Sequence, residues 1–324
     1  MKPQSFEYAR PGDLADVYAL LDRYGDEAKV LAGGQSLVPM MNLRLARPAL
    51  LVDLNALARP AAAGATGAGA NGAGADGAGA DGAGADGAGT ALSRLRREGA
   101  ALRAGALVRH RTLAELAGAD PLASLLARTA RRVAHPPIRN RGTLCGSLAH
   151  ADPAAEWSLV GLALDARVVV GSSQGVRELS VDALLDGPFS TTLRPTEVIL
   201  EAVFPALAPP WGGGLAELAR TAGSFAELAA CAVLGLAAGR VDAARVAVAG
   251  TQGRPVLLAG TAEALRGQRA DAALVGRAGD AVRGELAGAA DGHRREVLAA
   301  LVEDAVGEAL REVARWEVAR WSST

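Results

Sequence analysis

Cysteine, histidine and lysine are all scarce in this chain of 324 residues. Cys145 and Cys231 are its only two cysteines, which excludes a disulfide framework and an iron–sulfur cluster, because such a cluster normally needs four thiolates. The four histidines are scattered without the H-x-x-x-H or H-E-x-x-H spacing of a zinc site, so we expect no metal site. Lys2 and Lys29 are the only lysines, and with abundant Ala and Gly this indicates a bias of genome composition, not a function.

The chain also lacks an excess of charge of either sign and any long apolar run. Its 34 basic and 35 acidic residues give a net charge of −1, which argues against nucleic acid or another polyanion as partner. The first ten residues contain no apolar segment of the kind found in secretion signals, and no run of about 18 uncharged apolar residues occurs. We therefore expect a cytoplasmic protein without membrane insertion.

Glycine and alanine are abundant, above all in a low-complexity segment from about residue 61 to 90. Its G-A-G-A-D units place Asp76, Asp81 and Asp86 at a period of five. Such a segment has little to bury and cannot offset the entropy cost of ordering it, so we interpret it as a flexible inserted loop. The alternative is a calcium-binding β-roll, whose repeats, however, run in nines and carry an aliphatic position that is missing here.

Helix and strand patterns alternate through the remaining sequence. Apolar residues recur at helical spacing between Asp13, a candidate N-cap, and Gly25, a candidate C-terminal stop. The stretch 205–214, P-A-L-A-P-P-W-G-G-G, is the best linker candidate and predicts a domain boundary near 210, whereas 226–238 fits either a helix or a buried strand. The other expected elements are strands at 28–31, 50–54, 102–107, 167–170, 198–204 and 245–249, and helices at 112–116, 122–133, 157–164 and 296–316.

Two glycine-rich loops stand more than a hundred residues apart. The first is A-G-G-Q-S at Ala32 to Ser36, after an expected strand, and the second is R-N-R-G-T-L-C-G-S at Arg139 to Ser147. Neither has the G-x-G-x-x-G spacing of a Rossmann loop. Backbone N–H groups of small residues at a helix start can bind an anion. Two such loops closing on one pyrophosphate would make a dinucleotide site, and this pairing points to a flavin.

Four strings of residues together carry a resemblance to a known group of proteins. They are F-E-Y-A-R-P at Phe6, L-A-G-G-Q-S-L-V-P-M-M-N-L-R-L-A-R-P at Leu31, L-V-D-L at Leu51 and I-R-N-R-G-T-L-C-G-S-L-A-H-A-D-P-A-A-E-W at Ile138. In this order they resemble the FAD-binding medium subunit of the molybdenum hydroxylases, a family that includes the flavoprotein chains of carbon monoxide dehydrogenase and of the xanthine dehydrogenase group. The resemblance covers nearly the whole chain apart from 61–90, and the two loop motifs together are highly specific.

The resemblance implies an α+β protein. A vanillyl-alcohol-oxidase-like FAD-binding domain of the PCMH type would consist of two α/β subdomains, followed by a C-terminal α+β domain of the carbon monoxide dehydrogenase flavoprotein type. Residues 1–56 would form the first subdomain and 57–210 the second, which carries the insertion at 61–90. Residues 211–324 would form the C-terminal domain.

The resemblance also implies which residues hold the cofactor. The two loops would bind the FAD pyrophosphate through backbone and hydroxyl donors, and hydrogen bonds to a charged phosphate contribute about 1.5–3 kcal/mol each. Glu156 would lie against the cofactor, and Leu193 would approach the isoalloxazine. The loop residues assigned in this way are Ala32, Gly33, Gly34, Gln35, Ser36, Thr143, Leu144, Gly146 and Ser147.

A role in electron transfer follows from the same resemblance. In the family, a molybdenum subunit hydroxylates the substrate, electrons pass through [2Fe-2S] clusters of a small subunit, and FAD delivers them to NAD⁺, oxygen or a quinone-type acceptor. The chain would then be an oxidoreductase subunit without catalytic residues of its own. Its partners would be a small iron–sulfur subunit and a large molybdenum-cofactor subunit, in a dimer of heterotrimers. The cysteine count agrees, because the clusters must lie on another chain.

Two departures from the family pattern leave alternatives open. Cys145 stands where most relatives carry glycine; if that glycine has a positive φ, a side chain costs roughly 1–2 kcal/mol and places a Cβ near the phosphate oxygens. The third family motif, an Arg-rich turn followed by Gly-Asp-Phe-Ala, reads R-T-A-G-S-F-A here, with Ser224 in place of the acid and Thr221 in place of a basic residue. A structural or assembly subunit with weak FAD binding is therefore the alternative hypothesis. An independent flavin oxidase is a weaker one, because no convergent acid–base pair accompanies the loops.

Two side chains in the string A-H-A-D-P suggest a catalytic pair, His150 and Asp152. A capped turn explains them better, with Asp152 bonding to its own backbone before Pro153. For the Cys145 thiol, nearby phosphates would raise the pKa, which argues against a reactive thiolate.

Overall fold

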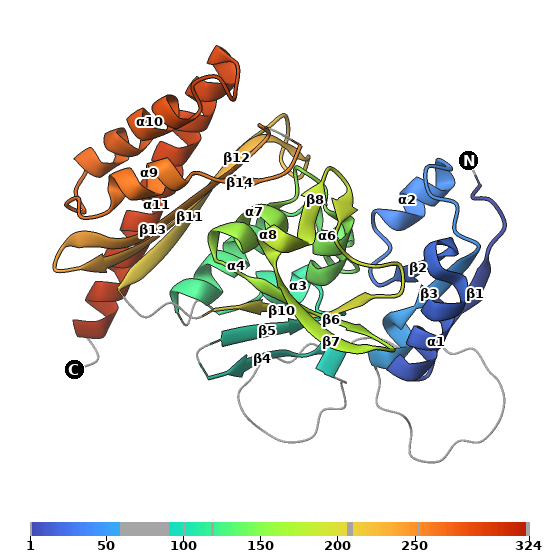
Figure 1. Cartoon of the computed structure of the whole chain (residues 1–324). Coiled ribbons are helices and arrows are strands. Elements are labelled where there is room, and N and C mark those ends of the chain that lie inside the picture. The colour runs from blue at the N-terminus through green and yellow to red at the C-terminus, as the bar shows by residue number, and fades with distance from the viewer. Residues whose placement is uncertain are drawn as a thin grey trace.

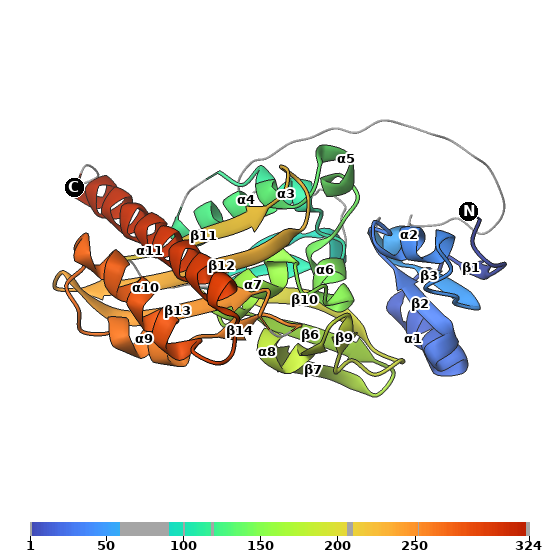
Figure 2. The same cartoon turned by 90° about the horizontal axis from the view of Figure 1, so that it is seen from above.

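The computed structural model describes residues 2–58, 91–99, 101–117, 120–205, 210–251 and 253–321. The segment 61–90, whose composition favours a flexible loop over a calcium-binding repeat, lies outside the described residues. Three main sheets and their helices form the described part (Figure 1), and the view from above places the first sheet beside the other two (Figure 2). The chain thus combines helices and strands, as the α+β class requires.

The N-terminal unit is a three-stranded parallel sheet in the order β1-β3-β2. Asp13 caps its first helix by accepting a hydrogen bond from the backbone N–H of Asp16 at 2.9 Å, and Gly25 ends that helix with a φ of 51°. Both expected caps are confirmed. The elements are β1 (Glu7–Ala9), α1 (Leu14–Tyr24), β2 (Ala28–Leu31), α2 (Leu37–Asn42) and β3 (Leu50–Asp53), with short 3-10 helices at Gly25–Glu27 and Leu54–Ala58.

The middle unit is a five-stranded antiparallel sheet in the order β4-β5-β10-β6-β7. Helices α4, α6 and α7 lie between this sheet and the C-terminal one (Figure 1), and their apolar side chains join both sheets in one core. The elements are β4 (Leu95–Glu98), β5 (Ala101–Gly105), α3 (His110–Ala114), α4 (Pro121–Arg132), α5 (Pro136–Arg139), α6 (Leu144–His150), α7 (Glu156–Ala163), β6 (Arg167–Ser172), β7 (Gly175–Ser180), α8 (Val181–Leu184), β8 (Leu185–Gly187), β9 (Ser190–Thr191) and β10 (Val198–Phe204), after a 3-10 turn at Ala91–Ser93.

The C-terminal unit is a four-stranded antiparallel sheet in the order β11-β12-β13-β14, covered on its outer face by three helices (Figures 1 and 2). The stretch 226–238, which fits a helix or a strand, forms strand β12 up to Ala237. Its odd-numbered residues, such as Cys231, face the core shared with the middle unit, and its even-numbered ones, such as Leu234, face the outer helices. A strand buried on both faces reads as a continuous apolar run, which explains the ambiguity. The elements are β11 (Trp211–Ala219), β12 (Ala226–Ala237), β13 (Arg240–Ala249), β14 (Val256–Leu257), α9 (Ala259–Leu265), α10 (Ala273–Glu285) and α11 (Gly292–Trp321).

The expected linker at 205–214 is wrong for its last residues, because Trp211 to Gly214 lie inside strand β11. The glycines are required there by close packing. A Cβ on Gly212 would lie 2.3 Å from the carbonyl oxygen of Ala309, and one on Gly214 would lie 2.0 Å from that of Ala305. The absence of side chains therefore lets helix α11 lie directly on the strand, and does not serve to make the chain flexible.

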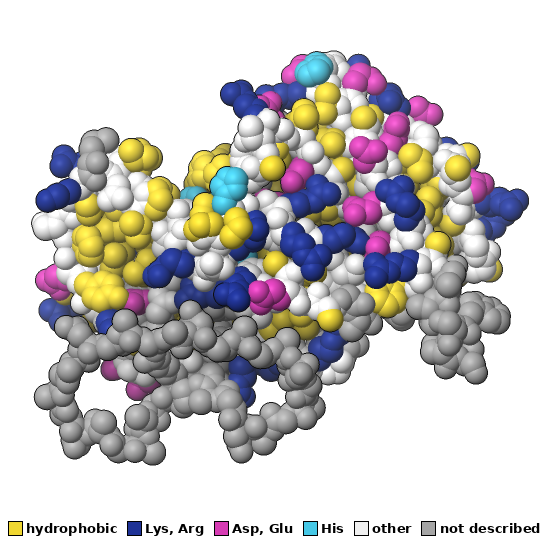
Figure 3. All heavy atoms as spheres, turned by 180° about the vertical axis from the view of Figure 1, so that it is seen from behind, with side chains coloured by type: hydrophobic (Ala, Val, Ile, Leu, Met, Phe, Trp, Pro, Cys, Tyr) yellow, Lys and Arg dark blue, Asp and Glu magenta, His cyan; other side chains and the backbone are white. Residues whose placement is uncertain are grey.

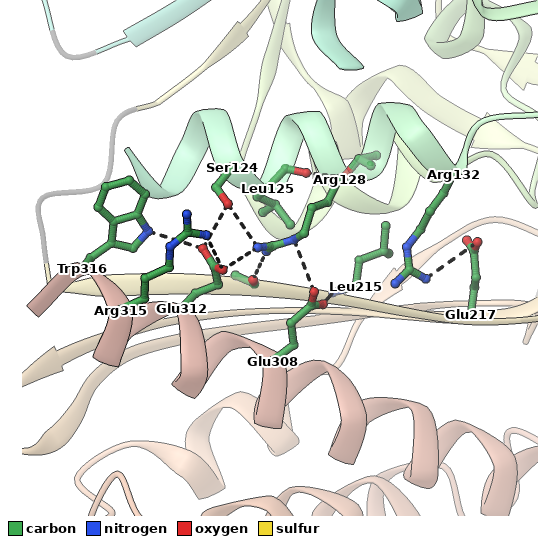
Figure 4. Close-up of polar contacts among 12 residues, drawn as sticks. Ser124, Leu125, Arg128, Arg132, Leu215, Glu217, Glu308, Glu312, Arg315 and Trp316 are labelled. Carbon is green, nitrogen blue, oxygen red and sulfur yellow. Dashed lines mark hydrogen bonds and ion pairs between the residues drawn. The ribbon is translucent and has the colours of Figure 1, made fainter. Parts of the chain in front are cut away.

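Arg128 of helix α4 ties the middle unit to the C-terminal one. Its guanidinium forms ion pairs with Glu312 at 2.8 Å and with Glu308 at 3.3 Å, and Nη2 donates to the carbonyl oxygen of Gly213 at 2.6 Å (Figure 4). Glu308 also accepts the backbone N–H of Leu215 at 2.8 Å. One guanidinium thus connects α4, β11 and α11, a geometry that suits the fork of donors that arginine carries.

Replacing Gly214 with alanine should destabilise the protein, because the new Cβ would overlap a helix backbone that cannot retreat without disturbing its packing. We expect Gly214→Ala to lower the free energy of unfolding by about 3 kcal/mol. Gly276, on the exposed side of α10, has open space around its Cα, so Gly276→Ala should be neutral or stabilising by up to about 1 kcal/mol. Urea denaturation of the two variants measures this, and equal midpoints would contradict the packing argument.

Candidate functional site

The two glycine loops meet in the structure. A Cβ on Gly33 would lie 2.5 Å from the carbonyl oxygen of Arg141 and 2.7 Å from the Cα of Gly142, so a residue with a side chain cannot occupy this position without moving the second loop. Gly34 has a φ of 70°, a conformation that favours glycine. The sequence pattern predicted that these distant segments act together, and the fold brings them into contact.

A cavity of about 440 Å³ lies beside this contact. Four of its lining residues belong to the predicted first loop: Ala32, Gly33, Gly34 and Gln35. The other lining residues were not among the predicted site residues, although Asn55 follows the L-V-D-L string and Arg141 stands in the second loop motif. The further lining residues are Tyr8, Leu31, Val38, Pro39, Asp53, Asn55 and Arg141. In the space-filling view, a notch separates the N-terminal unit from the rest of the molecule at their upper edge (Figure 3).

The first loop offers unpaired backbone donors. Within the described part of the chain, the backbone N–H groups of Gly33, Gly34, Gln35 and Ser36 have no hydrogen-bond acceptor. The Gln35 side chain donates instead to the carbonyl oxygen of Gly33 at 3.1 Å, which steadies the turn. Consecutive unpaired N–H groups form the kind of backbone concavity that binds an anion.

The second loop leads into helix α6, and its backbone donors are mostly engaged. The Thr143 hydroxyl accepts the backbone N–H of Gly146 at 3.1 Å, and the Ser147 N–H donates to the Thr143 carbonyl oxygen at 3.0 Å. The Leu144 N–H donates to the carbonyl oxygen of Val108 at 3.3 Å, and its side chain is buried in the core. Among the four predicted residues of this loop, the backbone N–H of Thr143 and the hydroxyl hydrogens of Thr143 and Ser147 therefore have no acceptor in the described part of the chain.

A neutral histidine, His110, packs against the second loop at Gly142. The Nδ1 atom of His110 accepts a hydrogen bond from Nε1 of Trp157 at 3.1 Å, and a Cβ on Gly142 would lie 2.8 Å from the ring. Burial lowers the pKa of His110 to about 4, assisted by the charges of Arg109 and Arg139. The ring is therefore uncharged near neutral pH. The sequence alone did not identify His110, because only the fold brings Trp157 beside it.

Glu156 and Leu193 lie apart from the cavity. Glu156 is the first residue of α7, and burial raises its pKa to about 7, with smaller contributions from the nearby acids Glu217 and Asp152. Leu193 is half-buried against the core of the middle unit. Neither side chain is among those that line the cavity.

Comparison with protein families decides the identity. A model described as "FAD binding domain in molybdopterin dehydrogenase" matches residues 4–69 and 90–207, and one described as "CO dehydrogenase flavoprotein C-terminal domain" matches residues 215–309. The chain belongs to the family of molybdopterin dehydrogenase flavoproteins. It is thus an oxidoreductase subunit whose cofactor is FAD, as the sequence resemblance implied.

Relatives of known activity agree with this assignment. The chain is 35% identical over 254 residues to the nicotine 6-hydroxylase medium subunit of Paenarthrobacter nicotinovorans, covering 78% of this chain and 77% of that protein. It is also 35% identical over 276 residues to the 6-hydroxypseudooxynicotine dehydrogenase complex subunit alpha of the same organism, covering 85% and 79%. A carbon monoxide dehydrogenase structure from Hydrogenophaga pseudoflava, which lacks the Mo-pyranopterin moiety of its molybdenum cofactor, matches with a TM-score of 0.80 and 27% identity, covering 96% of this chain and 99% of the other.

The residues present fit FAD. The cavity borders a loop with unpaired backbone donors, and glycine is sterically required where the loops touch. These are the properties that a pyrophosphate site needs, since the phosphate oxygens are strong acceptors. In the residues that the structure describes, no group of three His, Cys, Asp or Glu is placed to hold a metal ion, and no helix is long and apolar enough to cross a membrane.

The Cys145 side chain does not point towards the proposed phosphate position, although its place in the loop motif suggested that it would. It lies within helix α6 with a negative φ, is buried in the core, and its Sγ contacts the carbonyl oxygen of Ala104 at 3.7 Å. The conformational cost considered for a positive φ therefore does not arise. Burial raises the pKa of the thiol to about 12, with a smaller contribution from the charge of Glu201, so the thiol is neutral.

The other unusual motifs are turns. The backbone N–H of Ala154 donates to the Asp152 carboxylate at 2.9 Å, which confirms the capped turn at A-H-A-D-P. In R-T-A-G-S-F-A, the Ser224 hydroxyl donates to the carbonyl oxygen of Thr221 at 2.8 Å. Ser224 therefore closes the turn locally.

Gly33→Ala should weaken FAD binding strongly, because the added methyl group must push apart the two loops that meet beside the cavity. We expect the dissociation constant to rise at least tenfold, which corresponds to about 1.4 kcal/mol. Gly12→Ala is the matched control, since a Cβ there meets nothing within 4 Å. Flavin-fluorescence titration of the ligand-free proteins measures both, and an unchanged affinity of Gly33→Ala would show that the loop contact is not needed.

Glu156 should make the stability of the ligand-free protein depend on pH. Its pKa rises from an ordinary 4.5 to about 7 on folding, so burial stabilises the protonated form, and this contribution is lost as pH rises through 7. Glu156→Gln stays neutral, so its free energy of unfolding relative to wild type should increase between pH 4.5 and 8. Urea denaturation across this range tests it. Glu178→Gln, at an exposed position, is the control, and its free energy of unfolding should follow that of wild type across the pH range. If Glu156→Gln also followed wild type, the raised pKa of Glu156 would be contradicted.

Proposed function

We infer that the chain transfers electrons from [2Fe-2S] clusters of a partner subunit to a terminal acceptor. The observation that carries this inference is the contact of the two glycine loops beside a cavity, in a chain of a flavoprotein family with only two cysteines, both buried and unpaired. FAD exchanges one or two electrons, which is the chemistry that the bound cofactor would supply. The protein itself supplies the binding groups and their orientation.

The predicted loop residues are our proposal for the pyrophosphate site. The unpaired N–H groups from Gly33 to Ser36 would bind the phosphates directly, and the Thr143 and Ser147 hydroxyls would contribute from the second loop. Glu156 and Leu193 would lie towards the flavin ring, away from the described cavity. We also propose the division into units 1–56, 57–210 and 211–324.

The partners follow from the family. Related chains are named as medium subunits or as subunits of a complex, and so this chain belongs in a multi-subunit assembly. We propose a small iron–sulfur subunit and a large molybdenum-cofactor subunit, assembled as a dimer of heterotrimers. The test is purification through a tag on this chain, expressed with its neighbouring genes, followed by iron and molybdenum analysis. Recovery of the chain without an iron protein would reject the electron-transfer role.

The alternative is an assembly subunit that has lost FAD through Cys145 and the altered third motif at 220–226. The structure favours retention of FAD, because the Cys145 side chain points into the core and leaves the loop contact at Gly33 intact.

The purified chain should therefore be yellow and should release FAD on denaturation. Cys145→Gly should leave the FAD dissociation constant within about twofold of wild type while lowering stability by about 1–3 kcal/mol, since it opens a small cavity and places glycine in a helix. Absorbance at the flavin bands and a fluorescence titration measure these properties. A colourless protein that rejects micromolar FAD, or a large gain in affinity for Cys145→Gly, would support the assembly hypothesis instead.

A further inference from the structure

A chain of side-chain hydrogen bonds links the two loops. Nδ2 of Asn55 donates to the carbonyl oxygen of Ala32, in the first loop, at 2.9 Å. Nη2 of Arg109 donates to Oδ1 of Asn55 at 2.5 Å, and Nη1 of the same guanidinium donates to the carbonyl oxygen of Arg141 in the second loop. The pair Asn55–Arg109 therefore reaches from one loop backbone to the other; we call it the loop bridge.

The amide of Asn55 is held in one orientation. The Asp53 carboxylate accepts both its backbone N–H at 2.9 Å and its Nδ2 at 2.5 Å, and the other carboxylate oxygen accepts the Tyr8 hydroxyl. Asp53 and the Ala32 carbonyl can only accept, whereas the arginine can only donate. A flipped amide would oppose donor to donor and acceptor to acceptor, so only one orientation satisfies all its neighbours.

Arg109 is anchored on the second loop. On either side of it, the His110 N–H donates to the Gly142 carbonyl oxygen at 3.0 Å and the Leu144 N–H donates to the Val108 carbonyl oxygen at 3.3 Å. The side chain is half-buried. Burying a guanidinium costs free energy unless its N–H donors find acceptors. In the loop bridge, its donors bond to Asn55, which binds the first loop, and to the second loop directly.

A second attachment of the N-terminal unit lies on its helix side and is apolar. Val17 and Leu21 of α1 belong to one hydrophobic cluster with Leu107 and Val198 of the middle unit. The Tyr18 hydroxyl lies so close to Gly171 that a Cβ there would be 2.3 Å away. Apolar contact is non-directional and tolerates small rotations, so it does not by itself fix how far apart the loops stand.

We propose that Arg109 and Asn55 are positioning residues that set the separation of the two loops before the cofactor binds. This inference rests on the proposed FAD site for its functional meaning. A preformed separation lowers the ordering cost that binding would otherwise carry. Arginine is required because two separated donors must point in fixed directions, which the single ammonium of lysine cannot provide.

Hydrogen exchange on the ligand-free chain tests the bridge without any cofactor. In Arg109→Gln and Asn55→Ala, we expect the hydrogen-bonded amides within 141–147, such as those of Leu144 and Ser147, to exchange roughly tenfold faster, because the loops open more often. The double variant should match the single ones, since both remove the same bridge. Arg254→Gln is the matched control, because it loses an exposed ion pair with Asp182 at 2.9 Å and should leave loop exchange unchanged.

Titration with FAD tests the consequence for binding. Arg109→Gln, Arg109→Lys and Asn55→Ala should each raise the dissociation constant roughly tenfold, with Arg254→Gln equal to wild type. The proposal would be overturned if Arg109→Lys and Asn55→Ala both kept the loop exchange rates and the FAD affinity of wild type. If circular dichroism shows that Arg109→Gln is unfolded, these two variants alone test the proposal. If the wild-type chain binds no FAD, the proposed function fails, while faster exchange in the variants still supports the bridge.

Discussion

The close approach of Gly33 to the backbone of Arg141 and Gly142 is the constraint on which the site depends. Its Cβ position would lie 2.5 Å from a carbonyl oxygen, closer than a Cβ and an oxygen that are not bonded to each other can lie. The cavity, which both loops line, and the polar chain through Asn55 both require the loops to stand this close. A binding site formed by segments distant in sequence thus depends on one missing side chain.

The sequence predicted the parts of this arrangement that are local. The strand at 198–204, the cap at Asp13 and the turn at Asp152 follow from short-range patterns, and the structure has all three. The loops could be paired because their motifs occur together in one family. Asn55, Arg109 and His110 could not be found, because each acts through a partner that only the tertiary fold brings near. The three consecutive glycines after Trp211 were wrongly predicted to be part of a linker for a similar reason, since nothing in the local sequence shows that a helix will pack on them.

Cys145 shows how a departure from a family pattern depends on where the side chain points. A residue in a loop motif would be expected to face the ligand, but this motif continues into helix α6, which has one side towards the loops and another towards the core. The Cys145 side chain lies on the core side. Substitution there changes packing against strand β5, and the backbone donors of the loop keep their places.

Strand β12 buries its odd-numbered residues in the core of the middle unit and its even-numbered ones under the last helices. The cofactor-binding part of the chain therefore completes its own core with residues that are synthesised after it. During synthesis on the ribosome, the apolar surface of helices α4 and α7 stays uncovered until strand β12 has been made. A chain released before that point would expose this surface to water. The boundary that separates two families in sequence is not a boundary between two independently folding bodies.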